Sequence, residues 1–373
     1  MVRLYHKLRT LYSFPIRHKK TTIGVLFLFF FLVLASPFFK HLNTISAVLR
    51  GMALGEIESL KTKDRRTNFL ILGLGGPKNQ PSSLTDTQQF FSYDHTQERH
   101  ILLSIPRDIW IPNPGVKING LYSYGNSTEG SGIDLTKNAV TEITGQPVHY
   151  SVMVSFEGFV RFVDLLGGVN VNVERSFTDT QYPIKGKEND PCDGDPEFAC
   201  RWETISFKKG KSHFDGETAL KFVRSRHARG DEGTDFARAA RQQKIMLGIK
   251  DKILSPGFFF NPQKIEQVLG LTAEVFESDI PAEDFGVVVQ AFLRTKREKV
   301  QTNSLVAMDP ENPDENLTKP AFLIHPAISP LYKNQWVLIP VGGNWKATHA
   351  WIDCLIKGNE CSPEKFAPKI KPN

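Results

Sequence analysis

The sequence lacks the short motifs that identify the commonest enzyme classes. It contains no G-x-S-x-G hydrolase motif, no H-E-x-x-H protease motif, no P-loop and no G-x-G-x-x-G fingerprint after a strand. It also lacks a basic excess over most of its length. Of 46 Lys and Arg residues the first 20 positions hold six, which leaves 40 against 40 Asp and Glu. A nucleic-acid-binding protein carries basic charge on its folded part, so the composition argues against a nucleic-acid partner.

The first 20 residues contain no Asp or Glu, and residues 21–39 contain no charge at all. The second run is mostly Phe and Leu and, as a helix, is just long enough to cross a hydrocarbon core of about 30 Å. Because the cations precede it, the pattern predicts one transmembrane helix in the cell membrane, with a cytoplasmic N-terminus and residues 41–373 outside. The alternative is a cleaved signal peptide, since Ala35 and Ser36 are small, but the run is long and no A-x-A site follows it.

Cysteine is scarce, and all four residues fall on the predicted outer side. They form two close pairs, Cys192 with Cys200 and Cys354 with Cys361. Because oxidation is favoured outside the cytoplasm, the spacing predicts two local disulfides. Zinc is the alternative, but the pairs are far apart in the sequence and neither has the tight C-x-x-C spacing.

Short apolar runs alternate with helical patterns in the middle of the chain. Residues 68–74 form a continuous apolar run that ends in glycines, which is typical of a strand buried on both faces. Further strands are predicted at 87–93, 100–104, 149–154 and 169–173, and helices at 135–144, 156–166, 215–224 and 234–253. This alternation predicts an α/β fold similar to an α-β-α sandwich, in which helices flank a central mixed sheet after the transmembrane helix.

Shifts in composition predict the domain boundaries. The acidic and Pro-rich stretch around residues 308–315 indicates a linker, and a strand at 335–340 and a helix at 345–355 follow it. The predicted segments are a basic tail at 1–20, the span at 21–39, a stalk at 40–66, the main outer domain at 67–300, a linker at 301–320 and a C-terminal strand-helix extension at 321–373.

Arginines stand at the ends of apolar elements, where an unpaired charge is costly. Several guanidiniums on different elements suit a di- or polyphosphate, because the planar fork binds phosphate oxygens in pairs and keeps its charge. For any single arginine, the alternative is a structural pair with a local carboxylate. The residues in question, with a glutamine that shares a helix face with two of them, are Arg107, Arg224, Arg226, Arg238, Arg241 and Gln242.

Five ordered motifs resemble the LytR-CpsA-Psr family of envelope phosphotransferases. The resemblance covers the stretch from about 68 to 255, and the motifs together are more specific than any one motif. The resemblance implies a membrane-anchored enzyme that moves a glycosyl-phosphate polymer from a polyprenyl-pyrophosphate carrier to peptidoglycan or another wall glycan. The motifs are Leu84-Thr85-Asp86-Thr87, Ser104-Ile105-Pro106-Arg107-Asp108, Lys117-Ile118-Asn119 with Tyr122 and Tyr124, Gly216-Glu217-Thr218-Ala219-Leu220 leading into Arg224-Ser225-Arg226, and Asp235-Phe236-Ala237-Arg238-Ala239-Ala240-Arg241-Gln242-Gln243.

The resemblance also implies a role for each matching residue. Asp86 would hold a divalent metal, Mg²⁺, on the pyrophosphate. The metal and the arginines would neutralise charge while a wall-sugar hydroxyl attacks phosphorus, which is catalysis by positioning and electrostatics. The apolar helix at 156–166 would line a tunnel for the lipid tail, or is an ordinary core helix. Residues implied to bind or support the substrate are Arg107, Arg224, Arg226 and Gln242 at the phosphate oxygens, with Asp108, Lys117, Asn119, Arg238 and Arg241 around them.

Two positions depart from the family pattern. An aspartate usually follows the first strand where this chain has Gly75, and an arginine usually stands where it has Leu84. One expected metal-site carboxylate is therefore missing, which motivates an alternative function as a non-catalytic binder of lipid-linked phosphate or wall glycan. A membrane-bound regulator fits less well, because a cytoplasmic part of about 20 residues is too short to fold alone.

Overall fold

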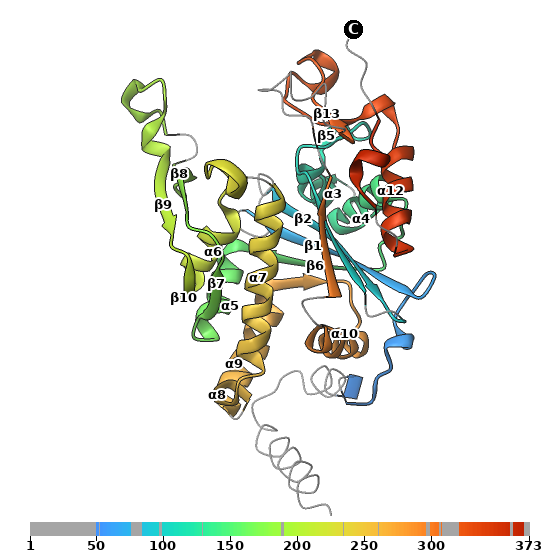
Figure 1. Cartoon of the computed structure of the whole chain (residues 1–373), viewed down its shortest axis with the longest axis vertical. Helices are drawn as coiled ribbons and strands as arrows, with labels where there is room; N and C mark the ends of the chain where they lie inside the picture. The colour runs from blue at the N-terminus through green and yellow to red at the C-terminus, as the bar shows by residue number, and fades with distance from the viewer. Residues whose placement is uncertain are drawn as a thin grey trace, which may run out of the picture.

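The computed structural model describes most of the chain after residue 49 (Figure 1). The predicted tail and the predicted span at 21–39 lie outside the described residues, as does the first part of the predicted stalk, residues 40–49. Within the described part, no helix is both long and apolar enough to cross a membrane. The described residues are 50–368 without 52, 76–83, 97–98, 129, 188–189, 234, 260, 296–298, 306, 308–320 and 359–360.

A six-stranded mixed sheet lies at the centre, in the order β11-β6-β1-β2-β3-β12. β1 runs parallel to β6, β3 runs parallel to β12, and β2 is antiparallel to both β1 and β3. The carboxyl ends of β1, β3, β6 and β12 therefore share one edge with the start of β2. The strands are β1 (Arg66–Leu74), β2 (Thr85–Asp94), β3 (His100–Ile105), β6 (Tyr150–Ser155), β11 (Phe276–Ser278) and β12 (Val300–Ser304).

Helices cover both faces of this sheet (Figure 1). Leu70, Leu72 and Leu74 pack toward one face with residues of α3 (Leu121–Thr128), α4 (Gly132–Thr144) and α12 (Lys346–Ile356). Phe69, which alternates with them, packs toward the other face with Val287 of α10 (Ala282–Arg294). The predicted mixed sheet flanked by helices is confirmed.

A second core lies beside the sheet. The rings of Phe177, Phe207, Phe214 and Phe222 pack together, with centroid separations between 5.0 and 5.9 Å. They join two short antiparallel pairs to the helices that connect this core with the sheet. These elements are β7 (Val169–Val173) with β10 (Gly210–Phe214), β8 (Phe177–Pro183) with β9 (Trp202–Phe207), α5 (Phe156–Leu165), α6 (Gly216–Arg224), α7 (Asp235–Ile253), α8 (Pro256–Phe259) and α9 (Pro262–Val275).

The five strands predicted between 68 and 173, and the four helices predicted between 135 and 253, lie within a few residues of their predicted bounds. The Asp215 side chain caps the first turn of the helix at 216–224, because it accepts a hydrogen bond from the Thr218 amide. The sheet extends further than expected, because β12 at 300–304 continues into the predicted linker at 301–320.

The C-terminal residues dock on the main sheet. Trp351, Ile352 and Leu355 of α12 belong to the same apolar cluster as the leucines of β1. The strand predicted at 335–340 is reduced to β14 (Ile339–Pro340), which pairs with β13 (Leu323–Ile324). Leu338 also bridges Ile109, so this extension lies directly against the segment that follows β3.

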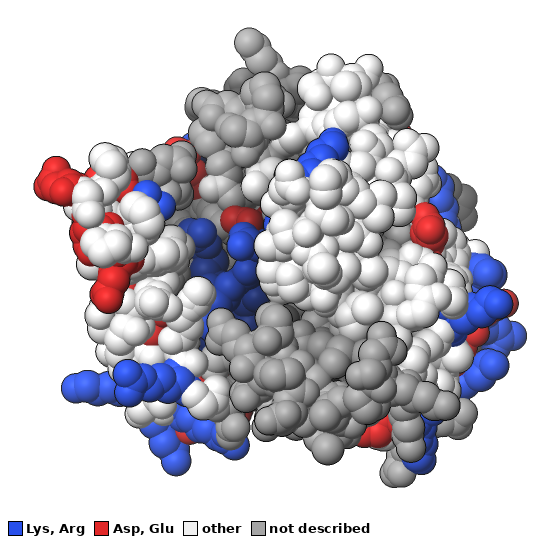
Figure 2. Space-filling model, turned by 90° about the horizontal axis from the view of Figure 1, so that it is seen from above, with Lys and Arg blue, Asp and Glu red and all other residues white. Residues whose placement is uncertain are grey.

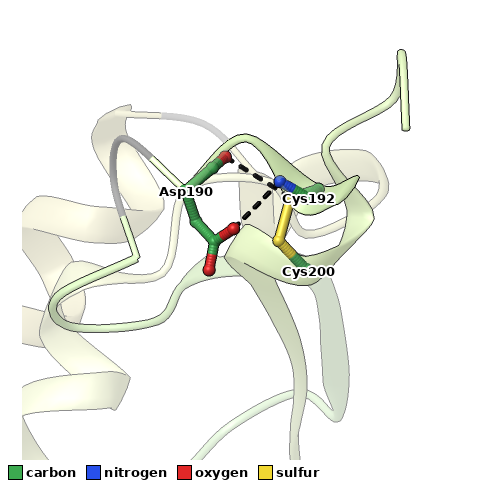
Figure 3. A group of neighbouring side chains, drawn as sticks. All are labelled: Asp190, Cys192 and Cys200. Atoms are coloured by element: carbon green, nitrogen blue, oxygen red, sulfur yellow. Dashed lines mark hydrogen bonds between the residues drawn. A yellow bond between two sulfur atoms is a disulfide. The ribbon is translucent and has the colours of Figure 1, made fainter. Parts of the chain in front are cut away.

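Both predicted disulfides are present, Cys192–Cys200 and Cys354–Cys361. The first lies at the end of the β8–β9 hairpin beside Asp190, whose carboxylate accepts a hydrogen bond from the Cys192 amide at 2.9 Å (Figure 3). These three residues are the one group of three metal-ligand side chains among the described residues. Because both sulfurs are oxidised, neither offers a thiolate, and the zinc alternative fails for this pair.

Candidate functional site

The predicted site residues gather at the sheet edge where β1, β3 and β6 end and β2 begins. Asp86 is the second residue of β2, and Arg107 lies two residues after β3. Arg224 ends α6, and Gln242 lies on α7. In open α/β sheets, ligands bind at the carboxyl ends of the strands, so this edge is the expected place for a site.

Asp86 and Arg107 form the centre of the site. The Arg107 Nη1 donates a hydrogen bond to the Asp86 Oδ1 at 2.6 Å, and both side chains are partly open to solvent, at 37% for Arg107 and 22% for Asp86. Burial lowers the pKa of Arg107, but the carboxylates of Asp86 and Asp108 outweigh it, so the pKa is raised overall. The guanidinium therefore stays charged and within reach of a ligand.

A short hairpin supports Arg107 from the other side. It consists of β4 (Trp110–Ile111) and β5 (Val116–Lys117). The Lys117 Nζ donates to the Asp108 Oδ1 at 2.8 Å, while the Asp108 Oδ2 lies 3.5 Å from the Arg107 Nε. Both carboxylate oxygens of Asp108 thus face cations, which suits a role in orienting Arg107.

Asn119 ties this hairpin to the start of β2 through its backbone. Its amide donates to the Arg107 carbonyl at 3.3 Å, and its carbonyl accepts from the Thr85 hydroxyl at 3.2 Å. Asn119 is itself buried. These contacts hold the Arg107 loop next to Asp86.

Two arginines reach the same edge from the second core. The Arg226 Nη2 donates to the Asp86 carbonyl at 3.3 Å. The Arg224 guanidinium lies over the ring of Phe156, 4.4 Å from its centroid, and Phe156 directly follows β6. Arg107 and Arg226 therefore both contact Asp86, and Arg224 lies beside the end of β6.

The helix α7 contributes residues with different surroundings. The Gln242 side-chain oxygen accepts from the Gln89 amide at 2.9 Å, which brings this residue to β2. Arg241 is only 1% exposed and donates to the carbonyls of Phe222 and Ser225. It therefore supports the Arg224–Arg226 segment from beneath. Arg238 is half-buried and lies near enough to Arg241 to contribute to the lowering of its pKa, of which burial is the main cause.

Viewed from above, the molecule has a hollow that contains Lys and Arg atoms together with an acidic group (Figure 2). The hollow lies between the side of the molecule that carries β8 and β9 in Figure 1 and the side that carries the C-terminal residues. A concave basic surface concentrates anions, because low-dielectric walls focus the field of its charges.

Gly75 lies against Asp86, at the position where the family pattern has an aspartate. A Cβ atom at residue 75 would lie 2.6 Å from the Asp86 Oδ2. The Gly75 amide donates to the Leu84 carbonyl at 2.8 Å, which joins the residues after β1 to those before β2. The second oxygen of Asp86 therefore occupies space that a side chain at residue 75 would enter.

Sequence reasoning missed three residues that position this site: Asp179, Gln89 and Phe156. Asp179 lies on β8, where residues 177–179 alternate between buried and exposed. An aspartate at an inward-facing position of an alternating strand is unusual. This pattern could have identified Asp179 from the sequence.

The sequence matches a known protein family and is similar to proteins of described activity. The model of the LytR_cpsA_psr family matches residues 44–318. The chain is 25% identical over 283 residues to the polyisoprenyl-teichoic acid–peptidoglycan teichoic acid transferase TagU of Oceanobacillus iheyensis. The alignment covers 71% of this chain and 79% of TagU. It is 26% identical over 287 residues to TagV of Bacillus subtilis, a transferase with the same activity in its name. This alignment covers 73% of this chain and 66% of TagV.

The fold has a counterpart among solved structures. The crystal structure of Bacillus subtilis TagV aligns over 80% of this chain and 100% of that chain, with a TM-score of 0.51 and 23% sequence identity. The likeness extends to the central sheet and its flanking helices. Since the family model matches most of the sequence, the chain belongs to the LytR-CpsA-Psr family.

Proposed function

We propose that this chain is a phosphotransferase that moves a glycosyl-phosphate polymer from a polyprenyl-pyrophosphate carrier to a hydroxyl of peptidoglycan or another wall glycan. The observation that carries the proposal is that Arg107, after β3, and Arg226, after α6, both donate to Asp86, while Arg224 lies over Phe156 at the end of β6. The names of the relatives TagU and TagV, which specify a polyisoprenyl-linked donor and peptidoglycan, support this choice of substrates.

The charge of the site suits a pyrophosphate. Four cations lie in this part of the molecule, Arg107, Lys117, Arg224 and Arg226, and Asp86 and Asp108 pair with Arg107 and Lys117. A pyrophosphate diester carries negative charge on both phosphorus centres, and guanidiniums bind such oxygens in pairs. Because Arg107 is partly exposed, a phosphate can contact its guanidinium while Asp86 holds the other side of the group.

The reaction needs little covalent chemistry from the protein. The acceptor oxygen forms a bond to the phosphorus that carries the sugar, and the bond from that phosphorus to the bridging oxygen breaks. Polyprenyl phosphate leaves with the bridging oxygen and takes up the hydroxyl proton. The arginines stabilise the charge that develops on the phosphate oxygens, which is the largest contribution a preorganised site makes.

Asp86 is the residue that would hold Mg²⁺. Its Oδ1 accepts from Arg107, and its Oδ2 faces Gly75. One carboxylate fits Mg²⁺, since this ion is held by one or two carboxylates together with substrate phosphates and waters. When bound, the ion would supply further charge neutralisation on the pyrophosphate.

The proposed donor is a lipid, which agrees with the predicted membrane anchor at 21–39. A single-pass protein with its N-terminus in the cytoplasm would hold the described domain outside, next to the membrane that contains the carrier. The two disulfides suit such an oxidising compartment.

Turnover of a short polyprenyl-pyrophosphate sugar by the full chain in detergent tests the proposal. We expect release of polyprenyl phosphate that requires Mg²⁺ and is lost in Asp86→Ala. The second candidate function, a non-catalytic binder, is motivated by Gly75. Tight binding of the donor without release, at any Mg²⁺ or Mn²⁺ concentration, would reject the transferase and establish the binder.

A further inference from the structure

The segment from Ser225 to Ala228 presents Arg226 to the site, yet it has little regular structure. It follows α6 directly, and Ser225 at its start is fully buried. An irregular loop holds an arginine in one place only when other groups fix its backbone. The contacts around this segment show which groups do so.

Asp179 accepts hydrogen bonds from three consecutive residues of this segment. Its Oδ2 accepts from the Ser225 hydroxyl at 2.7 Å, from the Arg226 amide at 3.0 Å and from the His227 amide at 3.1 Å. Its Oδ1 accepts from the Gln181 amide at 3.0 Å. The side chain is therefore fully engaged, and three of its four donors come from the Arg226 segment.

Asp179 stays ionised although it is only 1% exposed. Burial raises the pKa of its carboxyl, but the four hydrogen bonds outweigh burial, so the pKa is lowered. A neutral group of the same shape would be a poorer partner, because hydrogen bonds to a charged acceptor are stronger than those to a neutral one.

Arg241 holds the same segment from its carbonyl side. Its Nη2 donates to the Ser225 carbonyl at 2.7 Å, and its Nε donates to the Phe222 carbonyl at 2.9 Å. Its guanidinium lies 4.8 Å from the ring centroid of Phe177, two residues before Asp179 on β8. The backbone amides of the segment therefore face the buried Asp179 carboxylate, and the backbone carbonyls face the buried Arg241 guanidinium.

We propose that Asp179 is a positioning residue that sets the place of Arg226 at the sheet edge. It contacts the Arg226 amide directly, while the Arg226 side chain reaches the Asp86 carbonyl. The inference rests on the proposed function, since it assigns Asp179 a part in binding the pyrophosphate. It also links the β8–β9 hairpin, which lies outside the central sheet, to the site.

The test compares Asp179→Asn with Asp195→Asn in the full chain. Both positions lie in the β8–β9 hairpin, and Asp195 also accepts from two backbone amides, but these belong to Glu197 and Ala199 in the same hairpin. We expect Asp179→Asn to weaken binding of inorganic pyrophosphate and to lower kcat/KM for the lipid donor by about 10- to 100-fold, the loss expected for a small misplacement. Asp195→Asn should match the unaltered chain in both.

A double-mutant cycle with Arg226→Ala separates positioning from a general loss of structure. If Asp179 acts through Arg226, the pair Asp179→Asn with Arg226→Ala binds pyrophosphate no more weakly than Arg226→Ala alone. If the two losses multiply, Asp179 does not act through Arg226 and the inference is overturned. If Asp179→Asn does not fold, Ser225→Ala can replace it, because this variant removes only one of the donors to Asp179. A dissociation constant for pyrophosphate that is unchanged in Ser225→Ala would then reject the inference.

These measurements also distinguish this inference from the proposed function. An unaltered chain that neither binds pyrophosphate nor releases polyprenyl phosphate contradicts the proposed function itself. An unaltered chain that does both, beside an Asp179→Asn variant of equal affinity and kcat/KM, contradicts only the role of Asp179.

Discussion

The β1–β2 strand pair brings an arginine and an aspartate into contact at each of its two ends. At the start of β1, Arg66 lies 3.0 Å from Asp94, and their side chains are only 5% and 7% exposed. At the other end, Asp86 lies 2.6 Å from Arg107, and these side chains are 22% and 37% exposed. The same two residue types therefore form a buried pair at one edge of the sheet and an accessible pair at the other.

The two arginines differ in how completely their surroundings satisfy them. Arg66 also donates to the Ser92 hydroxyl, the Ser92 carbonyl and the Arg99 carbonyl. Arg107 donates to Asp86, while its buried Nε has Asp108 only at 3.5 Å. A saturated, buried guanidinium can only hold the fold together, whereas a partly exposed one with remaining capacity can take a ligand. Distance alone does not separate the two cases.

Removal of Arg66 should give the largest loss of stability. We expect Arg66→Ala to lower the free energy of unfolding by about 3–5 kcal/mol, because it removes the cation that pairs with the buried Asp94 carboxylate. Urea unfolding of the variant measures this loss. Replacement of both residues, Arg66→Met with Asp94→Leu, should recover much of it, since an apolar pair leaves no charge unpaired. A loss below about 1 kcal/mol in Arg66→Ala would contradict the structural role.

Removal of Arg107 should instead affect the reaction. We expect Arg107→Ala to reduce transfer by about 10²- to 10³-fold, as for the loss of one preorganised charge donor. Its free energy of unfolding should change by less than about 1 kcal/mol, because the pair with Asp86 is open to solvent. Arg107→Lys keeps the charge without the fork and should be intermediate. Near-normal transfer by Arg107→Ala, or by Arg226→Ala, would show that the site is wrongly assigned.

The buried edge should also make stability depend on pH through His100, which is buried and stacks on Tyr93 with ring centroids 4.3 Å apart. Burial, aided by Arg66 and opposed by Asp94, lowers the pKa of His100 from 6.5 to about 4. Because the folded state keeps this ring neutral, its contribution is complete above pH 6.5 and falls as the pH drops toward 4.

The size of this effect can be measured with a matched variant. Protonation of His100 in the unfolded chain should lower the free energy of unfolding by up to about 3 kcal/mol at pH 4. His100→Phe keeps an aromatic ring against Tyr93 and removes the titrating group. We expect its unfolding free energy to fall less between pH 6.5 and 4 than that of the unaltered chain. Equal slopes in the two proteins would contradict the buried, neutral state of His100.

Much of the site could be predicted from the sequence, because its residues lie in short local patterns. Apolar runs gave β1 and β3, and the motifs after them gave Asp86 and Arg107, which the structure brings together. The edge strand β12 was missed, because Val300-Gln301-Thr302-Asn303-Ser304 is polar and has no apolar run. An edge strand that is only half-buried leaves little pattern in a sequence.

The two arginines on α7 have different roles, and the sequence could not predict this difference. Arg238 and Arg241 share one helix face by spacing, so local periodicity treats them alike. The structure turns Arg241 under the segment after α6, where it binds the carbonyls of Phe222 and Ser225. That choice depends on packing between segments distant in the sequence. The contacts of Asp179 could not be predicted for the same reason, because Asp179 lies 46 residues before Ser225.

Gly75 allows the smallest and sharpest test of the accessible edge. An aspartate at this position would place a second carboxylate beside Asp86. Its Cβ would lie 2.6 Å from the present position of the Asp86 Oδ2, so the flexible Asp86 side chain would have to move slightly away. Gly75→Asp adds a charged oxygen ligand for Mg²⁺, whereas Gly75→Asn adds the same bulk without the charge. Because ligand charge sets the affinity of oxygen sites for hard cations, Gly75→Asp should lower the half-saturating Mg²⁺ concentration for transfer by about 3- to 10-fold relative to Gly75→Asn. Equal Mg²⁺ dependence in the two variants would mean that the metal does not lie at Asp86, and would leave the arginines as the charges that bind the pyrophosphate.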